Sequence, residues 1–313
     1  MTRPKLLAVG GAHIDRRGQV STVFVPGASN PGRMREDVGG GAFNALRNAV
    51  QRDVDCALMS VRGADAAGDS VASAIHAAKI RDISSVFLDR ATASYTAIVD
   101  VDGKVVAGLA DMELYEIVFA KQLRRSKARD EIADADAILC DANLPAAGLE
   151  RLALLADGKP LFAVAISPAK VVRFTGILAN VTCLFMNGRE AAALAAAPQE
   201  AGPAELARRL RSAGLRAGVI TAGSAAVTGF DAGGIFSIVP PAPPLVTDET
   251  GAGDALAGVT IVAMMHGKPL RAALREGIAA AGLTIASPKA VAEISGRVLA
   301  EALTLVPEPQ AVA

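Results

Sequence analysis

Residues 246–254 read Val-Thr-Asp-Glu-Thr-Gly-Ala-Gly-Asp and run directly into the apolar segment 255–258, Ala-Leu-Ala-Gly. Three small residues, Gly251, Ala252 and Gly253, therefore stand at the start of a predicted helix. The first N–H groups of a helix are unpaired and carry a partial positive charge, so small residues there let a phosphate approach closely. Asp254 would repel that phosphate, but its presence is explained if it takes a proton from an acceptor hydroxyl. The alternative is an ordinary first turn with a favourable acidic residue.

Short β-like runs alternate with helical patterns through the middle of the chain. Strands are predicted near residues 137–140, 161–165, 183–185 and 217–221, with helices near 146–156, 188–197 and 203–213. A first strand at 6–9 precedes them, and three helical segments near 252–266, 269–286 and 290–302 follow. This alternation is typical of a mostly parallel sheet covered by helices on both faces. We therefore predict a three-layer α/β/α fold.

Two stretches interrupt this pattern with a different β signal. Residues 18–38 are polar, with β-like pieces at 20–25 and 34–38 around a turn at Ser29-Asn30-Pro31-Gly32. Residues 95–101 and 104–109 alternate in hydrophobicity around Asp102-Gly103, which is a strong hairpin signal. We predict one α/β domain spanning residues 1–313, with a small β-sheet lid built from excursions at about 12–38 and 92–110.

The overall composition excludes several classes of function. Lys plus Arg and Asp plus Glu both total 32, so the net charge is +0, which argues against a nucleic-acid surface or a polybasic membrane anchor. The longest apolar run, 255–265, falls short of the roughly 20 residues of a membrane span. Cys56, Cys140 and Cys183 lack metal or disulfide spacing. We expect a cytoplasmic protein without nucleic-acid or membrane partners.

Two common nucleotide-binding motifs are missing from the sequence. No Gly-Lys pair is followed by the Ser or Thr of a P-loop, and no G-x-G-x-x-G follows the first strand. A phosphate site at 251–254 would therefore belong neither to a P-loop protein nor to a dinucleotide-binding domain.

Four landmarks, in this order along the chain, give the sequence a family resemblance. Residues 39–44, Gly-Gly-Gly-Ala-Phe-Asn, with Gly63 further on, look like an N-terminal G-G-x-x-x-N signature. Asn187-Gly-Arg-Glu190 matches an N-x-x-E motif, and Asp248–Asp254 looks like a D-T-x-G-A-G-D signature. Over nearly its whole length the chain resembles the ribokinase-like (PfkB) carbohydrate kinases.

This resemblance implies ATP as phosphate donor, magnesium as cofactor, and a role for each matching residue. Asp254 stands where the family has its catalytic base, and Gly251, Ala252 and Gly253 where it has its anion hole. The implied acceptor-binding residues are Asp15, Gly40, Gly41 and Asn44. Asn187 and Glu190 match residues that arrange magnesium through water, and Thr221 and Gly223 match a nucleotide loop, T-x-G-x-x-G, whose last position here is Ala226. A monovalent cation, K⁺, near the 248–253 loop is also implied.

Within the family, short matches are most similar to pseudouridine kinases. They include Asn44 with Asn48, Asp111-Met112 and Asp141-Ala142-Asn143. We therefore add Asp111 and Asn143 to the predicted acceptor site, although Asp141 and Asn143 could equally serve a turn at a strand end. The predicted reaction is transfer of the ATP γ-phosphate to the 5′-hydroxyl of pseudouridine.

Other interpretations stay open at this point. A ribokinase-type sugar kinase or another nucleoside kinase would show the same motifs. Glu249 stands where the signature usually has Thr, so a catalytically silent ligand-binding protein on the same scaffold is a second alternative. The lid's partly apolar strands would need a partner, and pairing two lids would give a homodimer.

Overall fold

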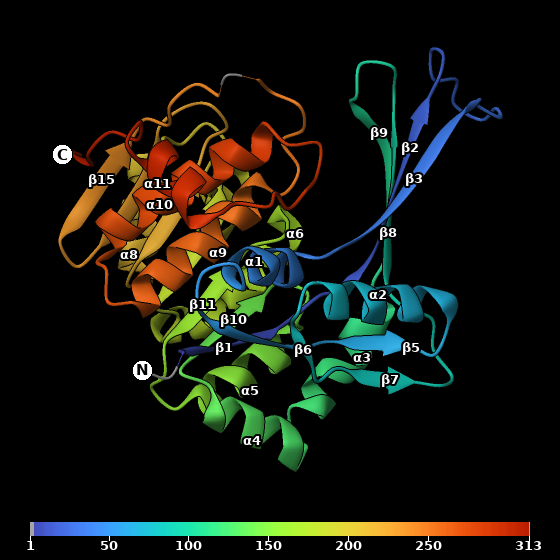
Figure 1. The fold of residues 1–313 in the computed structure, drawn as a ribbon, viewed down its shortest axis with the longest axis horizontal. Coiled ribbons are helices and arrows are strands. Elements are labelled where there is room, and N and C mark those ends of the chain that lie inside the picture. The colour runs from blue at the N-terminus through green and yellow to red at the C-terminus, as the bar shows by residue number, and fades with distance from the viewer. Residues whose placement is uncertain (1–2, 244, 313) are drawn as a thin grey trace.

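A computed structural model describes residues 3–243 and 245–312 of the chain (Figure 1). Its central element is one large sheet. The strands of this sheet are β1 (Lys5–Val9), β4 (Asp55–Met59), β6 (Arg81–Asp82), β10 (Ala137–Asp141), β11 (Leu161–Val164), β12 (Cys183–Asn187), β13 (Gly218–Thr221), β14 (Val227–Asp231), β15 (Gly234–Ile238) and β16 (Gln310–Val312). They follow the order β16-β15-β14-β13-β12-β11-β10-β1-β4-β6. The strands from β13 to β6 pair in parallel, and β14 to β16 add antiparallel pairs at one edge.

Helices cover both faces of this sheet. One face carries α1 (Gly41–Ala49), α2 (Ala66–Ala77), α9 (Ala252–Met265), α10 (Leu270–Ile285) and α11 (Gly296–Leu303). The other carries α3 (Glu113–Gln122), α4 (Ser126–Asp134), α5 (Ala146–Ala156), α6 (Pro168–Val171), a 3₁₀ helix (Val172–Asn180), α7 (Gly188–Leu194) and α8 (Pro203–Ser212). The predicted three-layer α/β/α architecture is confirmed.

Strand β10 shows why the sequence folds this way. All five of its residues, Ala-Ile-Leu-Cys-Asp, are buried. Ile138 and Cys140 point into the core under α3 to α8, whereas Ala137 and Leu139 point into the core under α1 and α9. Side chains alternate across a strand, so an uninterrupted apolar run fills two cores at once.

A second sheet projects from the body, at the upper right of Figure 1. It consists of β2 (His13–Val20), β3 (Gly32–Gly39), β8 (Ser94–Val99) and β9 (Val105–Asp111), in the order β3-β2-β8-β9. We call this sheet the lid. At the Asp102-Gly103 turn between β8 and β9, Gly103 has a φ of 79° and Asp100 N–H donates to Lys104 O at 2.9 Å. The hairpin expected there is present.

The first lid hairpin differs from the sequence prediction. The strand expected at 20–25 lies earlier, at 13–20, and residues 21–31 connect β2 to β3. The Asn30 side chain organises that connection, accepting from Val25 N–H and donating to Val25 O and Ala28 O. An Asn side chain that bonds nearby backbone competes with strand pairing, and this explains the shift.

Several elements were not expected from the sequence. Helix α3 has helical spacing in its buried residues Leu114, Tyr115, Val118 and Phe119, so its signal is present in the sequence. Helix α4 is mostly charged and buries only Ala128 and Ile132, which leaves almost no pattern. Short strands β5 (Val61–Gly63) and β7 (Ser85–Phe87) pair with each other in a sheet of their own.

The last helix begins at Gly296 rather than at residue 290, where the sequence predicted its start. No helix of the described residues is long and apolar enough to cross a membrane.

Helices α9 and α10 pack closely at a glycine, and α9 carries Asp254 in its first turn. A Cβ added at Gly277 would lie 2.5 Å from Leu256 O and closer still to Thr260 Oγ1. Gly282, one turn further along α10, has no heavy atom within 4 Å of that position. Replacing each of these two glycines by alanine therefore separates the effect of steric crowding from the effect of helix propensity.

We predict that Gly277→Ala lowers the free energy of unfolding by about 1–3 kcal/mol, because the added methyl forces α9 and α10 apart. Gly282→Ala should raise it by about 0.5–1 kcal/mol, since alanine favours the helix without meeting a neighbour. Urea denaturation followed by circular dichroism measures both. Equal effects of the two substitutions would contradict the close contact.

Candidate active site

The site forms at the carboxyl end of the parallel strands, where β1 lies between β10 and β4. The chain leaves β1 for β4 on one side and returns to β10 on the other, and parallel sheets bind ligands at such points. Asp141, the last residue of β10, is fully buried there. Its Oδ2 accepts from Gly11 N–H at 2.9 Å and Ala42 N–H at 3.1 Å. This carboxylate therefore joins the end of β1 to the start of α1.

Helix α1 brings Asn44 to the first turn of α9. Asn44 Nδ2 donates to Asp254 Oδ2 at 3.1 Å, across 210 residues of sequence. Gly41 is next to the same carboxylate, and a Cβ there would lie 3.8 Å from Asp254 Oδ1 and would collide with Ile166. Gly40, with a φ of 116°, makes the turn into α1. The structure thus brings the predicted residues Gly40, Gly41, Asn44 and Asp254 together.

Asp254 is electrostatically unusual. Burial raises its pKa to about 7, although the hydrogen bond from Asn44 acts in the opposite direction. The negative charges of Asp141, Asp15 and Glu190 raise it further. Asp254 is therefore within electrostatic range of three other predicted or candidate acids. A carboxyl group with a pKa near neutrality is well suited to accept a proton.

The predicted anion hole begins with a turn that requires glycine. Gly251 is left-handed, with a φ of 82°, and a Cβ there would collide with the Ala290 carbonyl oxygen. Ala252 N–H donates to Glu249 O at 3.3 Å, so it is already engaged. In the described part of the chain, no acceptor takes the N–H of Gly253 or Asp254. Gly253 is exposed with open space beyond it. Two amides at the start of α9 are therefore free to bind an anion.

Asp15 lies on β2 at the base of the lid. His13 Nε2 is 3.3 Å from Asp15 Oδ1, and His13 Nδ1 is 3.3 Å from the hydroxyl of Tyr115. That hydroxyl donates to Ala12 O at 2.9 Å and accepts from Ala12 N–H at 3.0 Å. A residue from α3 thus fixes the chain just before Asp15. Nothing in the sequence pattern singles out Tyr115 for this role.

Asn143 is held by three hydrogen bonds, one from its backbone and two at its side chain. Its backbone N–H and Nδ2 donate to Asp141 at 2.9 and 3.2 Å, and its Oδ1 accepts from Lys170 Nζ at 2.7 Å. Burial lowers the pKa of Lys170, while the charge of Asp141 raises it. These contacts show the structural role of Asn143 at the strand end, and its role in acceptor binding stays a prediction. Lys170 is a further residue that the sequence analysis missed.

Asn187 and Glu190 form a reciprocal cap at the start of α7. Asn187 Oδ1 accepts from Glu190 N–H at 3.0 Å, and Glu190 Oε2 accepts from Asn187 N–H at 2.7 Å. Glu190 is buried rather than an exposed helix charge, and burial raises its pKa. Thr221 pairs with Asn187 across β13 and β12, and Gly223 follows with a φ of 61°. The predicted nucleotide residues therefore lie side by side.

Few side chains at the candidate site could ligate magnesium. In the ranges 3–243 and 245–312, no three His, Cys, Asp or Glu residues are grouped so as to hold a metal. Glu190 commits one carboxylate oxygen to its own helix cap and keeps the other. One hard oxygen ligand fits an ion that is held mainly by phosphates and water, which is how magnesium usually binds at such sites.

Asp111 does not join this group. Cross-strand pairs Ile14–Ser94 and Ser94–Asp111 place it on the lid face opposite Asp15, and it is exposed. The sequence match gave no face for this residue, because the register of β9 depends on pairing with β8. We leave Asp111 out of the candidate site.

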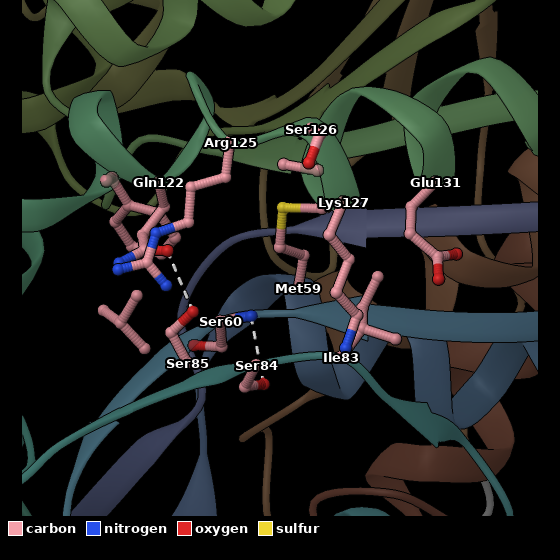
Figure 2. A pocket seen from close by; sticks show the side chains of 13 residues that line it. Met59, Ser60, Ile83, Ser84, Ser85, Gln122, Arg125, Ser126, Lys127 and Glu131 are labelled. Atoms are coloured by element: carbon pink, nitrogen blue, oxygen red, sulfur yellow. Dashed lines mark hydrogen bonds between the residues drawn. The ribbon is translucent and has the colours of Figure 1, made fainter.

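A separate hollow of about 510 Å³ lies beyond the end of β4, against α3 and α4 (Figure 2). Figure 2 shows Ser85 Oγ donating to Gln122 Oε1 at 2.9 Å, and Ser60 N–H donating to Ser84 Oγ at 3.1 Å. None of the predicted site residues lines it. The predicted residues lie instead at the carboxyl end of the parallel strands around Asp254, which stays the candidate active site.

The raised pKa of Asp254 predicts how the stability of the folded protein depends on pH. Its pKa is about 7 in the folded chain and 3.8 as the ordinary value, so the folded state binds the extra proton between these limits. Stability should therefore fall as the pH rises through this window. Asp254→Asn cannot ionise, so it should melt at least about 2 °C above the parent protein at pH 8.

Differential scanning calorimetry between pH 4 and 8 tests this prediction. The difference in melting temperature should shrink towards pH 4, where Asp254 of the folded parent protein is protonated and the unfolded carboxyl, with its ordinary pKa of 3.8, is close to half protonated. Asp130→Asn, at an exposed position of α4, serves as the control. A parallel pH profile for the Asp254→Asn and parent proteins would show that the carboxyl titrates normally.

Comparisons with known proteins fit this geometry. The family model described as pfkB family carbohydrate kinase matches residues 3–295. A solved carbohydrate kinase from Agrobacterium tumefaciens is 43% identical in sequence, with a TM-score of 0.86. The alignment covers 98% of this chain and 99% of the Agrobacterium chain. The chain belongs to the pfkB family and is an ATP-dependent carbohydrate kinase. Its fold is that of solved ribokinases.

Two curated relatives come from Escherichia coli (strain K12). A pseudouridine kinase is 25% identical over 279 residues, covering 86% of this chain and 87% of the relative. An uncharacterised sugar kinase is 30% identical over 179 residues, or 57% of this chain. That second match spans about half of the relative's own length, 49%.

Proposed function

We propose that this pfkB-family kinase transfers the γ-phosphate of ATP to the 5′-hydroxyl of a ribosyl compound, and that its preferred acceptor is pseudouridine. The observation that carries the proposal is the Asn44–Asp254 hydrogen bond beside the free amides of Gly253 and Asp254. A proton acceptor and an anion-binding helix start are thereby joined in one turn. The full-length similarity to a pseudouridine kinase supports the choice of acceptor.

Asp254 would act as the general base. With a pKa of about 7, its carboxylate can take the hydroxyl proton as the oxygen attacks the γ-phosphorus. The transition state of phosphoryl transfer is loose, so alignment and charge stabilisation matter more than base strength. The amides of Gly253 and Asp254 supply fixed donors for the developing negative charge. Gly251, Ala252 and Gly253 keep that turn free of bulky side chains.

The acceptor would lie between the lid and the end of β1. Asp15 is half-exposed there, and Gly39 leaves room for its carboxylate, because a Cβ at Gly39 would collide with Asp15 Oδ2. A carboxylate and an amide suit the vicinal hydroxyls of a ribosyl group, since one accepts and the other also donates. Asn143, fixed by Asp141 and Lys170, offers a second amide to the acceptor.

The nucleotide would extend from Gly253 towards Asn187, Thr221 and Gly223. Magnesium, when bound with ATP, neutralises phosphate charge. Glu190 would contribute its free carboxylate oxygen, directly or through water. For K⁺ near the 248–253 loop, family resemblance is the only support. The three free, buried thiols suit a reducing compartment, and on that ground we propose the cytoplasm.

An ATP-consumption assay with pseudouridine, uridine, inosine, adenosine, ribose and fructose 6-phosphate tests the proposal. We expect pseudouridine to give the highest kcat/KM. Asp254→Asn should lower that rate by about 10²- to 10⁴-fold while leaving acceptor binding measurable. Ribose turned over at least as well as pseudouridine would reassign the acceptor, and no turnover with any of the six would favour a silent binding protein.

We also propose that two lids pair in a homodimer. Met34 and Leu109 are exposed at 57% and 70% on the face opposite Asp15, and β3 and β9 are open edges of a four-stranded sheet. Exposed apolar residues on an open sheet favour association with a second copy.

Light scattering at micromolar concentration measures this association. The parent protein should be dimeric, and Met34→Ser combined with Leu109→Ser should shift it towards monomer. Leu154→Ser, which removes an equally exposed leucine from α5, should leave the mass unchanged. A monomeric parent protein would rule the lid dimer out.

A further inference from the structure

The two faces of the lid arrange their charges in opposite ways. On one face, Arg16 lies directly across from Glu36, and its Nε donates to Glu36 Oε2 at 2.8 Å. On the other face, Asp15 lies across from Asp37 and Arg17 across from Arg35. We call the face with Asp15, Arg17 and Arg35 the inner face. It therefore carries two like-charge pairs where the outer face carries an ion pair.

Like charges directly opposite each other weaken an antiparallel pair. Arg17 and Arg35 are both exposed, so water screens part of the repulsion, and the acids of this face, Asp15 and Asp37, lie in the next pair along the strands rather than opposite the arginines. Residues that weaken their own strand pairing in this way are often ones that bind a group outside the sheet. The two guanidinium groups are therefore placed to share an anion.

The inner face points at the loop before the anion hole. Arg17 Nη1 lies 3.9 Å from Asp248 Oδ2. Partial burial alone would raise the pKa of Asp248, but hydrogen bonds from Thr250 and the charges of Arg17 and Arg35 lower it overall. Both arginines therefore act on a carboxylate three residues before Gly251.

Asp248 is an incomplete partner for these two arginines. The 3.9 Å separation is at the limit of an ion pair, and the side chains of Arg17 and Asp248 are 48% and 38% exposed. Asp248 Oδ1 already accepts from Thr250 N–H at 2.9 Å. A phosphate group offers three oxygens and more charge, so it would compete well for both guanidinium groups.

We propose that Arg17 and Arg35 form a phosphate-binding pair on the lid, which takes the terminal phosphate of the nucleotide in place of Asp248. This inference rests on the proposed use of ATP at Gly251–Asp254. The nucleotide is the source of the phosphate rather than the acceptor, because the arginines face the loop that leads into the anion hole. An anionic acceptor beside Asp15 would instead meet the Asp15–Asp37 carboxylates.

Isothermal titration calorimetry with a non-hydrolysable ATP analogue and with ADP, without acceptor, tests the pair. Arg17→Gln and Arg35→Gln should each weaken binding of the ATP analogue by about tenfold, the effect expected of one charge-assisted contact. Binding of ADP should change much less, because it lacks the terminal phosphate. Arg17→Lys should recover part of the affinity.

Arg16→Gln is the matched control, since it makes the same change one residue away on the outer face. It should leave both affinities unchanged, and thermal melting should show all variants folded. Equal effects of Arg16→Gln and Arg17→Gln would overturn the phosphate pair, as would an effect confined to turnover of fructose 6-phosphate. A parent protein that binds no ATP analogue would instead overturn the proposed function, and with it this inference.

Discussion

The carboxylate of Asp141 is the interaction on which the site depends. It lies fully buried at the end of β10 and accepts hydrogen bonds from the end of β1, the start of α1 and Asn143. A buried carboxylate is tolerated only when it is well hydrogen-bonded, and here backbone amides from separate segments provide that compensation. If these segments moved apart, α1 would no longer hold Asn44 against Asp254. The geometry of the candidate site therefore depends on one internal hydrogen-bond acceptor.

Charge in this protein is organised locally rather than globally. The whole chain is neutral, with 32 basic and 32 acidic residues. Around the site, however, acids gather at the carboxyl ends of the strands and bases approach from α1, α6 and the lid. Arg47 Nη1 lies 3.5 Å from Asn44 Oδ1, and Lys170 bonds Asn143. A polyanionic substrate can thus be received without a basic surface, through a few directed groups.

Much of the fold and part of the site could be predicted from sequence, and the limits have physical causes. Strand–helix alternation is a local signal, so the layers were predictable. The small residues at 251–253 were also informative, because they indicated a helix start open to an anion, and the structure adds that the backbone at Gly251 excludes a side chain. Asp141 could not be assigned, since its partners Gly11 and Ala42 lie 130 and 99 residues away. Likewise, the face on which Asp111 lies depends on strand register, which no motif records.

The lid also constrains how this sequence can change in length. Alternate residues of β2 serve different surfaces: Asp15 and Arg17 face the loop of Asp248, whereas Arg16 and Gly18 face outward with Glu36 and Met34. Inserting or deleting a single residue within β2 would exchange the two sets, because successive side chains of a strand point to opposite faces of the sheet. We therefore expect insertions and deletions to be tolerated only in the connections at 21–31 and 100–104, where a change of length leaves the faces of the strands unchanged.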